Sequence, residues 1–184
     1  EALASGFSAA YATTPVESSG TQDRDAHMFG IRVGKTFKNA KLSPTITLWY
    51  DSLTGSDDDD MTGNDWGGFN TLYDTGHKFY GFMDFFLNIP ANTGQQGLVD
   101  LMLKGEMKVA ANAKLALHLH NFSLFEGNSK KLGQEVDAIF SYAYNKACAI
   151  QWGGLLFVPD DGMKTLKGND DPAFKIYVQT MVNF

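Results

Sequence analysis

Apolar and polar side chains alternate with a period of two along much of this chain, most clearly near its end. There Phe174, Ile176 and Val178 fall on one face, while Lys175 and Gln179 fall on the other. Successive side chains of a β-strand point to opposite faces of the sheet. The pattern therefore predicts a strand with one apolar face and one polar face.

The same alternation predicts eight extended segments, and no convincing helical period runs longer than two turns. The segments are residues 2–13, 27–37, 43–53, 98–109, 115–122, 132–144, 148–158 and 173–184. A segment of about ten residues, rising about 3.4 Å per residue and tilted near 40°, spans about 26 Å, the height of the apolar band of an outer-membrane barrel. The pattern thus favours an all-β, antiparallel transmembrane β-barrel.

Short and long connections alternate between these segments, as they do in outer-membrane barrels. The short turns are predicted at residues 38–41, 110–113 and 145–146. Counting residues 77–88 as another strand would put the acidic interval 55–76 on the side of the short turns. We therefore predict eight spanning strands in one domain, residues 1–184, with residues 55–97 as one long outer loop.

Composition narrows the classes of protein that remain. No apolar run reaches the length of about 18 residues that a membrane-spanning helix needs, so any membrane role must come from strands. The net charge of −6 argues against a nucleic-acid partner, which would need a basic surface. The single cysteine, Cys148, excludes an internal disulfide.

No motif in the sequence indicates an enzyme. The chain has no G-x-S-x-G, no HExxH, no phosphate-binding loop and no cysteine with a basic neighbour. We therefore expect no catalytic residue and no cofactor. His77 and Asp84 lie seven residues apart, but no nucleophile accompanies them, so a hydrogen bond from His77 to a lumen carboxylate that anchors the loop is the better interpretation.

His118 and His120 are two apart on one predicted strand and share a face, so together they could bind a metal ion with a third ligand. A simpler interpretation makes them lumen side chains that hydrogen-bond to Glu135 and Asp137 on the next strand, and no metal site is predicted here. The aspartate run at residues 57–60 lacks the ligand spacing of a calcium loop. It is expected to be a solvated acidic loop that divalent ions bridge loosely.

The long loop combines this acidic run with a cluster of aromatic residues. Its aromatic side chains include Trp66, Phe69, Tyr73, Phe79, Tyr80, Phe82, Phe85 and Phe86. Three placements would bury them: inside a wide lumen, on the rim of the barrel, or against a partner. An eight-stranded ring is filled by its own side chains, so the first placement requires a wider barrel.

The loop also carries a pattern of the form FxxLYxTGHKFYGxxD, preceded by a strand that ends in SGD. The matching positions are Gly55, Asp57, Phe69, Leu72, Tyr73, Gly76, His77, Gly81 and Asp84. This pattern resembles the alginate-export family of outer-membrane β-barrel channels. The resemblance implies that the chain is the C-terminal part of a barrel of about 16–18 strands in a Gram-negative outer membrane. Separately, the aromatic last residue, Phe184, on the apolar face resembles the terminal signature of bacterial outer-membrane proteins, which implies that the outer-membrane insertion machinery reads it.

The predicted function is therefore a porin or export-type channel for hydrophilic solutes or glycans, with lipid around it. Charges of both signs are expected along the solute path, which does not favour a strong anion field. The predicted path residues are Arg32, Lys104, Glu106, Lys108, His118, His120, Glu135, Asp137 and Lys175, with His77, Lys78, Tyr80 and Asp84 in the constricting loop. Basic and acidic members are expected to pair across neighbouring strands.

Two other readings of the same pattern remain open. One is a non-conducting outer-membrane surface protein that binds a partner through its long loops. The other is a soluble β-sandwich or lipocalin-like carrier.

Overall fold

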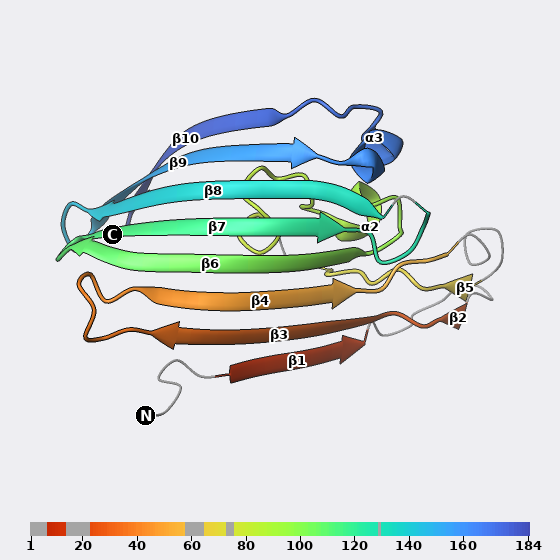
Figure 1. The fold of residues 1–184 in the computed structure, drawn as a ribbon, viewed down its shortest axis with the longest axis horizontal. Helices are drawn as coiled ribbons and strands as arrows, with labels where there is room; N and C mark the ends of the chain where they lie inside the picture. The colour runs from red at the N-terminus through yellow and green to blue at the C-terminus, as the bar shows by residue number, and fades with distance from the viewer. Residues whose placement is uncertain (1–6, 14–22, 58–64, 73–75, 129) are drawn as a thin grey trace.

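The computed structural model describes residues 7–13, 23–57, 65–72, 76–128 and 130–184. Its main element is an antiparallel sheet of eight strands in the order β1-β3-β4-β6-β7-β8-β9-β10 (Figure 1). Each strand pairs with the next main-sheet strand in the chain, so the sheet is a meander. The predicted all-β, antiparallel fold with eight long strands is confirmed.

The observed strands agree closely with the predicted segments. They are β1 Phe7–Thr13, β3 His27–Thr36, β4 Thr45–Leu53, β6 Leu98–Ala110, β7 Ala113–Ser123, β8 Lys131–Ala143, β9 Cys148–Pro159 and β10 Ala173–Val182. The start of the first predicted segment, residues 2–6, lies outside the described residues. A small parallel pair, β2 Asp23–Arg24 with β5 Asp65–Trp66, forms a separate sheet.

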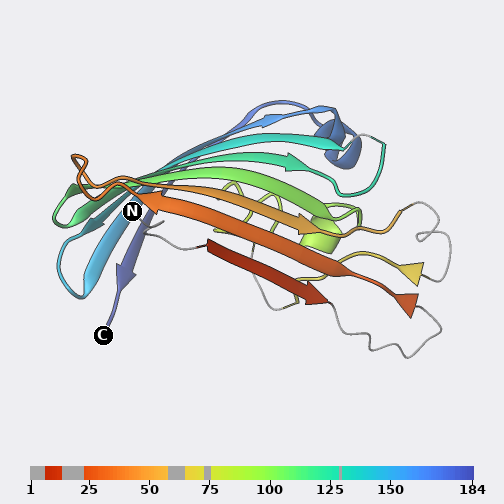
Figure 2. The ribbon, with the colours of Figure 1, turned by 60° about the horizontal axis from the view of Figure 1, so that its bottom comes forward.

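The sheet is strongly curved and open. Figure 2 shows it arching over the segment that follows β5. The strands β1 and β10 are the first and last in the strand order, and they do not pair with each other among the described residues. The structure is therefore a curved wall, consistent with part of a barrel rather than a closed ring.

The two faces of this wall differ in chemistry. The outer face carries large apolar side chains that are exposed: Ile46, Leu48, Leu101, Leu103, Leu117, Leu119, Val136, Phe140, Trp152, Leu156, Ile176 and Val178. The inner face carries buried polar side chains, among them Asp51, Asp100 and Glu135. The alternation in the sequence thus separates an apolar outside from a polar inside, the reverse of a soluble sandwich.

The two ends of the sheet differ as well. The turns after β3, β6 and β8 lie at one end, and the longer connections after β4, β7 and β9 lie at the other (Figure 1). Two helices belong to these longer connections: α2 Ile89–Asn92 and α3 Asp161–Lys167. No helix among the described residues is long and apolar enough to cross a membrane.

The helix α3 lies in the connection between the predicted segments 148–158 and 173–184, where the sequence shows no helical period. The Asp160 side chain accepts a hydrogen bond from the backbone at the N-terminus of α3. Gly168 ends the helix with φ of 75°, a left-handed conformation that favours glycine. Both signals were present in the sequence, but the helix is too short to show a period.

The main apolar core lies at the end of the sheet where the long connections gather. Side chains from the inner face, the long loop and both helices meet there, including Leu53, Phe86, Ile89, Phe122, Leu132, Phe157 and Met163. Phe86 packs against Phe122 with ring centroids 4.8 Å apart, and Phe85 packs against Phe157 at the same distance. This core fixes one end of the loop on the inner face.

Candidate functional site

The inner face of the wall gathers the predicted path residues. Their pleat positions on β3, β6, β7, β8 and β10 share the face that the loop covers. His118, His120, Glu135 and Asp137 are buried in the middle of this face. Lys108 has the same parity but is exposed near the turn that follows β6.

The loop between β5 and β6 lies against this inner face. Phe79 packs on Trp49 of β4 with ring centroids 6.1 Å apart. Phe82 belongs to a small apolar cluster with Ile139 and Leu155, and its ring is stacked on Tyr177 of β10. Phe79 and Phe82 therefore pack on the inner face of the wall, as in the first of the three placements considered. Phe69, Phe85 and Phe86 join the apolar core at the end of the sheet, Trp66 lies in β5, and Tyr73 lies outside the described residues.

Strand side chains hold the loop by its backbone. The Glu135 Oε1 atom accepts a hydrogen bond from the Met83 N–H at 2.8 Å. The Asp137 carboxylate accepts a longer one, 3.4 Å, from the Phe82 N–H. On β10, Lys175 Nζ donates to the Phe82 carbonyl at 2.8 Å. Because these contacts join residues far apart in the sequence, they set the path of the loop across the sheet.

A second anchor lies beside the first. Lys175 also contacts the Asp84 carboxylate at 2.6 Å, and His77 Nδ1 hydrogen-bonds to the other oxygen of Asp84. Burial raises the pKa of Asp84, but the contacts with Lys175 and His77 outweigh it and hold this pKa below the usual range. The predicted hydrogen bond from His77 to a lumen carboxylate is thus corrected: its partner is Asp84 in the same loop.

The predicted pairing of opposite charges across strands needs correction too. Lys104 pairs with Glu106 at 3.3 Å within β6, so this pair lies along one strand. Glu135 and Asp137 bind the loop backbone instead of a lysine. Arg32 does pair across strands, but with Asp51 of β4, at 3.0 Å.

Two further acidic residues of the inner face bind basic partners: Asp51, which was not among the predicted path residues, and Asp100, which lies on the polar side of the predicted segment 98–109. Asp51 binds Arg32, whose guanidinium lies 3.7 Å from the centroid of the Trp49 ring. Asp100 binds His120, with 2.9 Å between a carboxylate oxygen and Nδ1. This replaces the predicted partners of His120 on β8. The available signal was an aspartate at an inward position of a strand whose outward positions are apolar.

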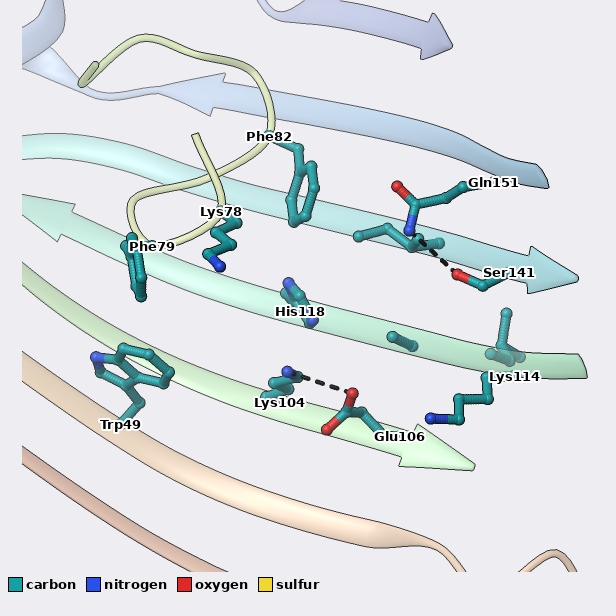
Figure 3. A pocket seen from close by; sticks show the side chains of 13 residues that line it. Trp49, Lys78, Phe79, Phe82, Lys104, Glu106, Lys114, His118, Ser141 and Gln151 are labelled. Atoms are coloured by element: carbon teal, nitrogen blue, oxygen red, sulfur yellow. Dashed lines mark hydrogen bonds and ion pairs between the residues drawn. The ribbon is translucent and has the colours of Figure 1, made fainter. Parts of the chain in front are cut away.

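A pocket of about 350 Å³ opens between the loop and the sheet. Figure 3 shows Lys78 and Phe82 of the loop on one side of it, Trp49 and Lys104 on another, and His118 between them. Three lysines and one carboxylate line the pocket: Lys78, Lys104, Lys114 and Glu106. Amines beside aromatic rings can bind a polar or anionic solute non-covalently.

Metal-binding potential is restricted to one place in the described part of the chain. His118, His120 and Asp137 have donor atoms within 4.8 Å of one another. Of the predicted acidic run, Asp57 is exposed and residues 58–60 lie outside the described residues. The expectation for that run therefore stays a prediction.

An antiparallel wall with an apolar outer face and a polar inner face under a long loop is consistent with part of a protein of the transmembrane β-barrel class. Within this class, the chain belongs to the alginate export family, whose model matches residues 7–129. This confirms the resemblance found in the loop. Proteins of this family are outer-membrane channels and not enzymes. No curated protein matches the chain.

Proposed function

We propose that the protein is a channel of a Gram-negative outer membrane through which hydrophilic solutes or glycans move passively. The observation that carries this proposal is the division of one sheet between an exposed apolar face and a polar face covered by a loop. Family membership supports the same conclusion. Lipid hydrocarbon is then the partner of the outer face, and solute is the partner of the inner one.

The outer face has the chemistry that a bilayer requires. Leu101, Leu103 and Leu117 each expose well over a third of their surface. Moving a leucine side chain out of water contributes about 1.5–3 kcal/mol, so a face of a dozen such residues strongly favours hydrocarbon. The backbone is hydrogen-bonded from strand to strand, which is the other requirement for a sheet in lipid.

The open edges imply a wider ring. Unpaired backbone groups of β1 and β10 in hydrocarbon would each cost several kcal/mol. Further strands between these edges would satisfy them. A ring of about 16–18 strands also leaves an aqueous space, which the loop could narrow without filling.

The solute path runs along the inner face past the pocket. Lys104 and Lys114 on the sheet and Lys78 on the loop supply positive charge there, while Glu106 supplies negative charge. Lys175, Glu135 and Asp137 hold the loop that narrows the path. A path lined by both signs of charge should admit many polar solutes and should not select strongly for cations or anions.

Conductance of the intact protein in a planar lipid bilayer tests the proposal. We expect stable single-channel currents, and a salt gradient should give a reversal potential that shifts towards cations in the triple variant Lys78→Glu, Lys104→Glu, Lys114→Glu. Lys146→Glu, in the exposed turn after β8, is the control and should leave the potential unchanged. Folded protein that inserts and never conducts would contradict the channel and favour the surface protein that binds a partner.

A further inference from the structure

The inner face contains a group of buried donor atoms that loop attachment does not account for. His118 and His120 extend from β7, and Asp137 extends from β8 directly opposite His118 in the strand register. All three residues are buried, and their donor atoms lie within 4.8 Å of one another. The side chains of His120 and Asp137 are fully inaccessible to solvent.

Several of these donor atoms lack a hydrogen-bond partner. They are both ring nitrogens of His118, Nε2 of His120 and Oδ1 of Asp137. Buried polar atoms normally find a partner, because leaving one without a partner costs as much as a lost hydrogen bond. Here the atoms without partners come from three neighbouring side chains, so one bound ion would satisfy several of them at once.

The hydrogen bond between His120 Nδ1 and Asp100 leaves Nε2 of the same ring available to bind a metal ion. With its proton on Nδ1, the ring donates to the Asp100 carboxylate at 2.9 Å. Nε2 then keeps its lone pair and lies 3.9 Å from Asp137 Oδ2. A carboxylate behind a ligating histidine is the usual second contact of such ligands in proteins. Phe122, stacked on His120 with ring centroids 5.0 Å apart, holds the ring in this orientation.

Local charge also favours a cation. Asp100, Glu135 and Asp137 are buried together, and none forms an ion pair with a lysine or arginine among the described residues. A divalent ion would offset this concentration of carboxylates. An entry path exists as well, because His118 lines the pocket between loop and sheet (Figure 3).

We propose that His118, His120 and Asp137 form a binding site for a divalent transition metal of the zinc type. Two imidazoles and one carboxylate suit such borderline ions, whereas calcium and magnesium prefer sets of oxygen ligands. Ligand bonds of about 2.0–2.2 Å place tetrahedral donors about 3.4 Å apart, so small side-chain rotations would close the site. The fourth position would be left to water or to a solute that enters through the pocket lined by His118.

A bound metal ion would affect the loop through the Asp137 side chain. The same carboxylate accepts the long hydrogen bond from the Phe82 N–H, so drawing it towards the histidines changes the attachment of the loop. The site thus couples metal binding to the segment that narrows the proposed path.

The test uses the intact protein in detergent, stripped with chelator and then given zinc or cobalt. We expect one zinc per chain after desalting, a visible cobalt spectrum of low-symmetry, four-coordinate type, and a higher melting temperature with zinc than with chelator. His118→Gln with His120→Gln should abolish all three effects. His27→Gln, a histidine at the start of β3, is the matched control and should keep them.

Two results would overturn the proposal. One is equal zinc content in the double variant and the wild type. The other is a wild-type melting temperature that zinc does not change. The second measurement needs no variant, so it stays decisive if the double variant does not fold; Asp137→Asn then provides the ligand deletion.

Discussion

At the scale of single residues, the close approach of the loop to the sheet depends on Gly81. Its φ is +85°, and an added Cβ would lie 2.5 Å from a carboxylate oxygen of Glu135. Glycine permits both the left-handed backbone and the contact, which lets Glu135 reach the Met83 N–H. Gly81 is therefore a position of the loop where a side chain is not tolerated.

Gly81→Ala should lower the free energy of unfolding by more than the left-handed backbone alone, which costs about 1–2 kcal/mol. The additional loss comes from displacing Glu135, and it should expose the loop to protease. Gly168→Ala is matched in backbone, with φ of +75° and no atom near the added Cβ, so it shows the backbone cost alone. Equal losses in the two variants, measured by chemical unfolding, would mean that Glu135 does not need Gly81.

Asp84 gives a second residue-scale prediction, with a defined pH dependence. Asp84→Asn should lower the free energy of unfolding by about 1 kcal/mol at neutral pH, because the partly exposed contacts to Lys175 and His77 lose a charge. Asn also tolerates the φ of 69° found at this position. The folded pKa of Asp84 is lowered, so its stabilisation is complete above the unfolded value of about 3.9 and is lost as pH falls through the folded value.

Unfolding curves of wild type and Asp84→Asn should therefore differ at neutral pH and converge in strong acid. Asp170→Asn is the control, since its ion pair with Lys164 is exposed and screened by solvent, so its removal should leave the free energy of unfolding almost unchanged. A difference that persists undiminished in strong acid would contradict the assignment.

At the scale of elements, the strands follow from the sequence and the loop does not. Alternation from Val136 to Phe140 is a local signal, and it located β8 to within a residue at each end. The path of the loop depends on hydrogen bonds such as Met83 to Glu135, which join residues 52 positions apart. No local period records such contacts, so sequence alone left three placements open.

The partner of His120 shows the same limit. Strand register puts Glu135 directly across from His120, which supports the predicted pair. Glu135 instead binds the loop backbone, and His120 turns to Asp100 on its other neighbour, β6. Choosing between two neighbouring strands required the position of the loop.

The pairing of β9 with β10 contains two adjacent glycines with opposite roles. Gly153 faces inward, and an added Cβ would overlap the ring of Tyr177 on the neighbouring strand. That ring stacks on Phe82, and its hydroxyl donates to Gln151 at 2.8 Å. Gly154 faces outward, with no atom within 4 Å of an added Cβ.

Gly153→Ala should therefore lower the free energy of unfolding by about 1–3 kcal/mol, because Tyr177 must leave its position over the glycine. Gly154→Ala should be neutral, or stabilising by up to about 1 kcal/mol, since alanine restricts the unfolded chain. Urea unfolding in detergent compares the two. Similar losses at both positions would contradict the position of the Tyr177 ring over Gly153.

At the scale of the whole molecule, the two faces place the wall relative to its surroundings. The outer face is apolar along every strand from β4 to β10, and the inner face holds the charged groups and the loop. In water this arrangement would leave a large apolar surface exposed. A bilayer covers this apolar surface and removes that cost. The free energy lost when a charged side chain is placed on the outer face should then depend on how deep that side chain lies in the bilayer.

Two outward positions on β6 measure this depth dependence. Leu103 is near the middle of the strand and Val109 is near its end, and both are exposed. In lipid vesicles, Leu103→Arg should lower the free energy of unfolding by about 2–4 kcal/mol, the cost of an arginine at the bilayer midplane. Val109→Arg should lower it by only about 0–1 kcal/mol, the cost near the interface. In water-rich detergent solution the two variants should differ little. If they cost the same in vesicles, the outer face does not lie in hydrocarbon, and the channel proposal fails with it.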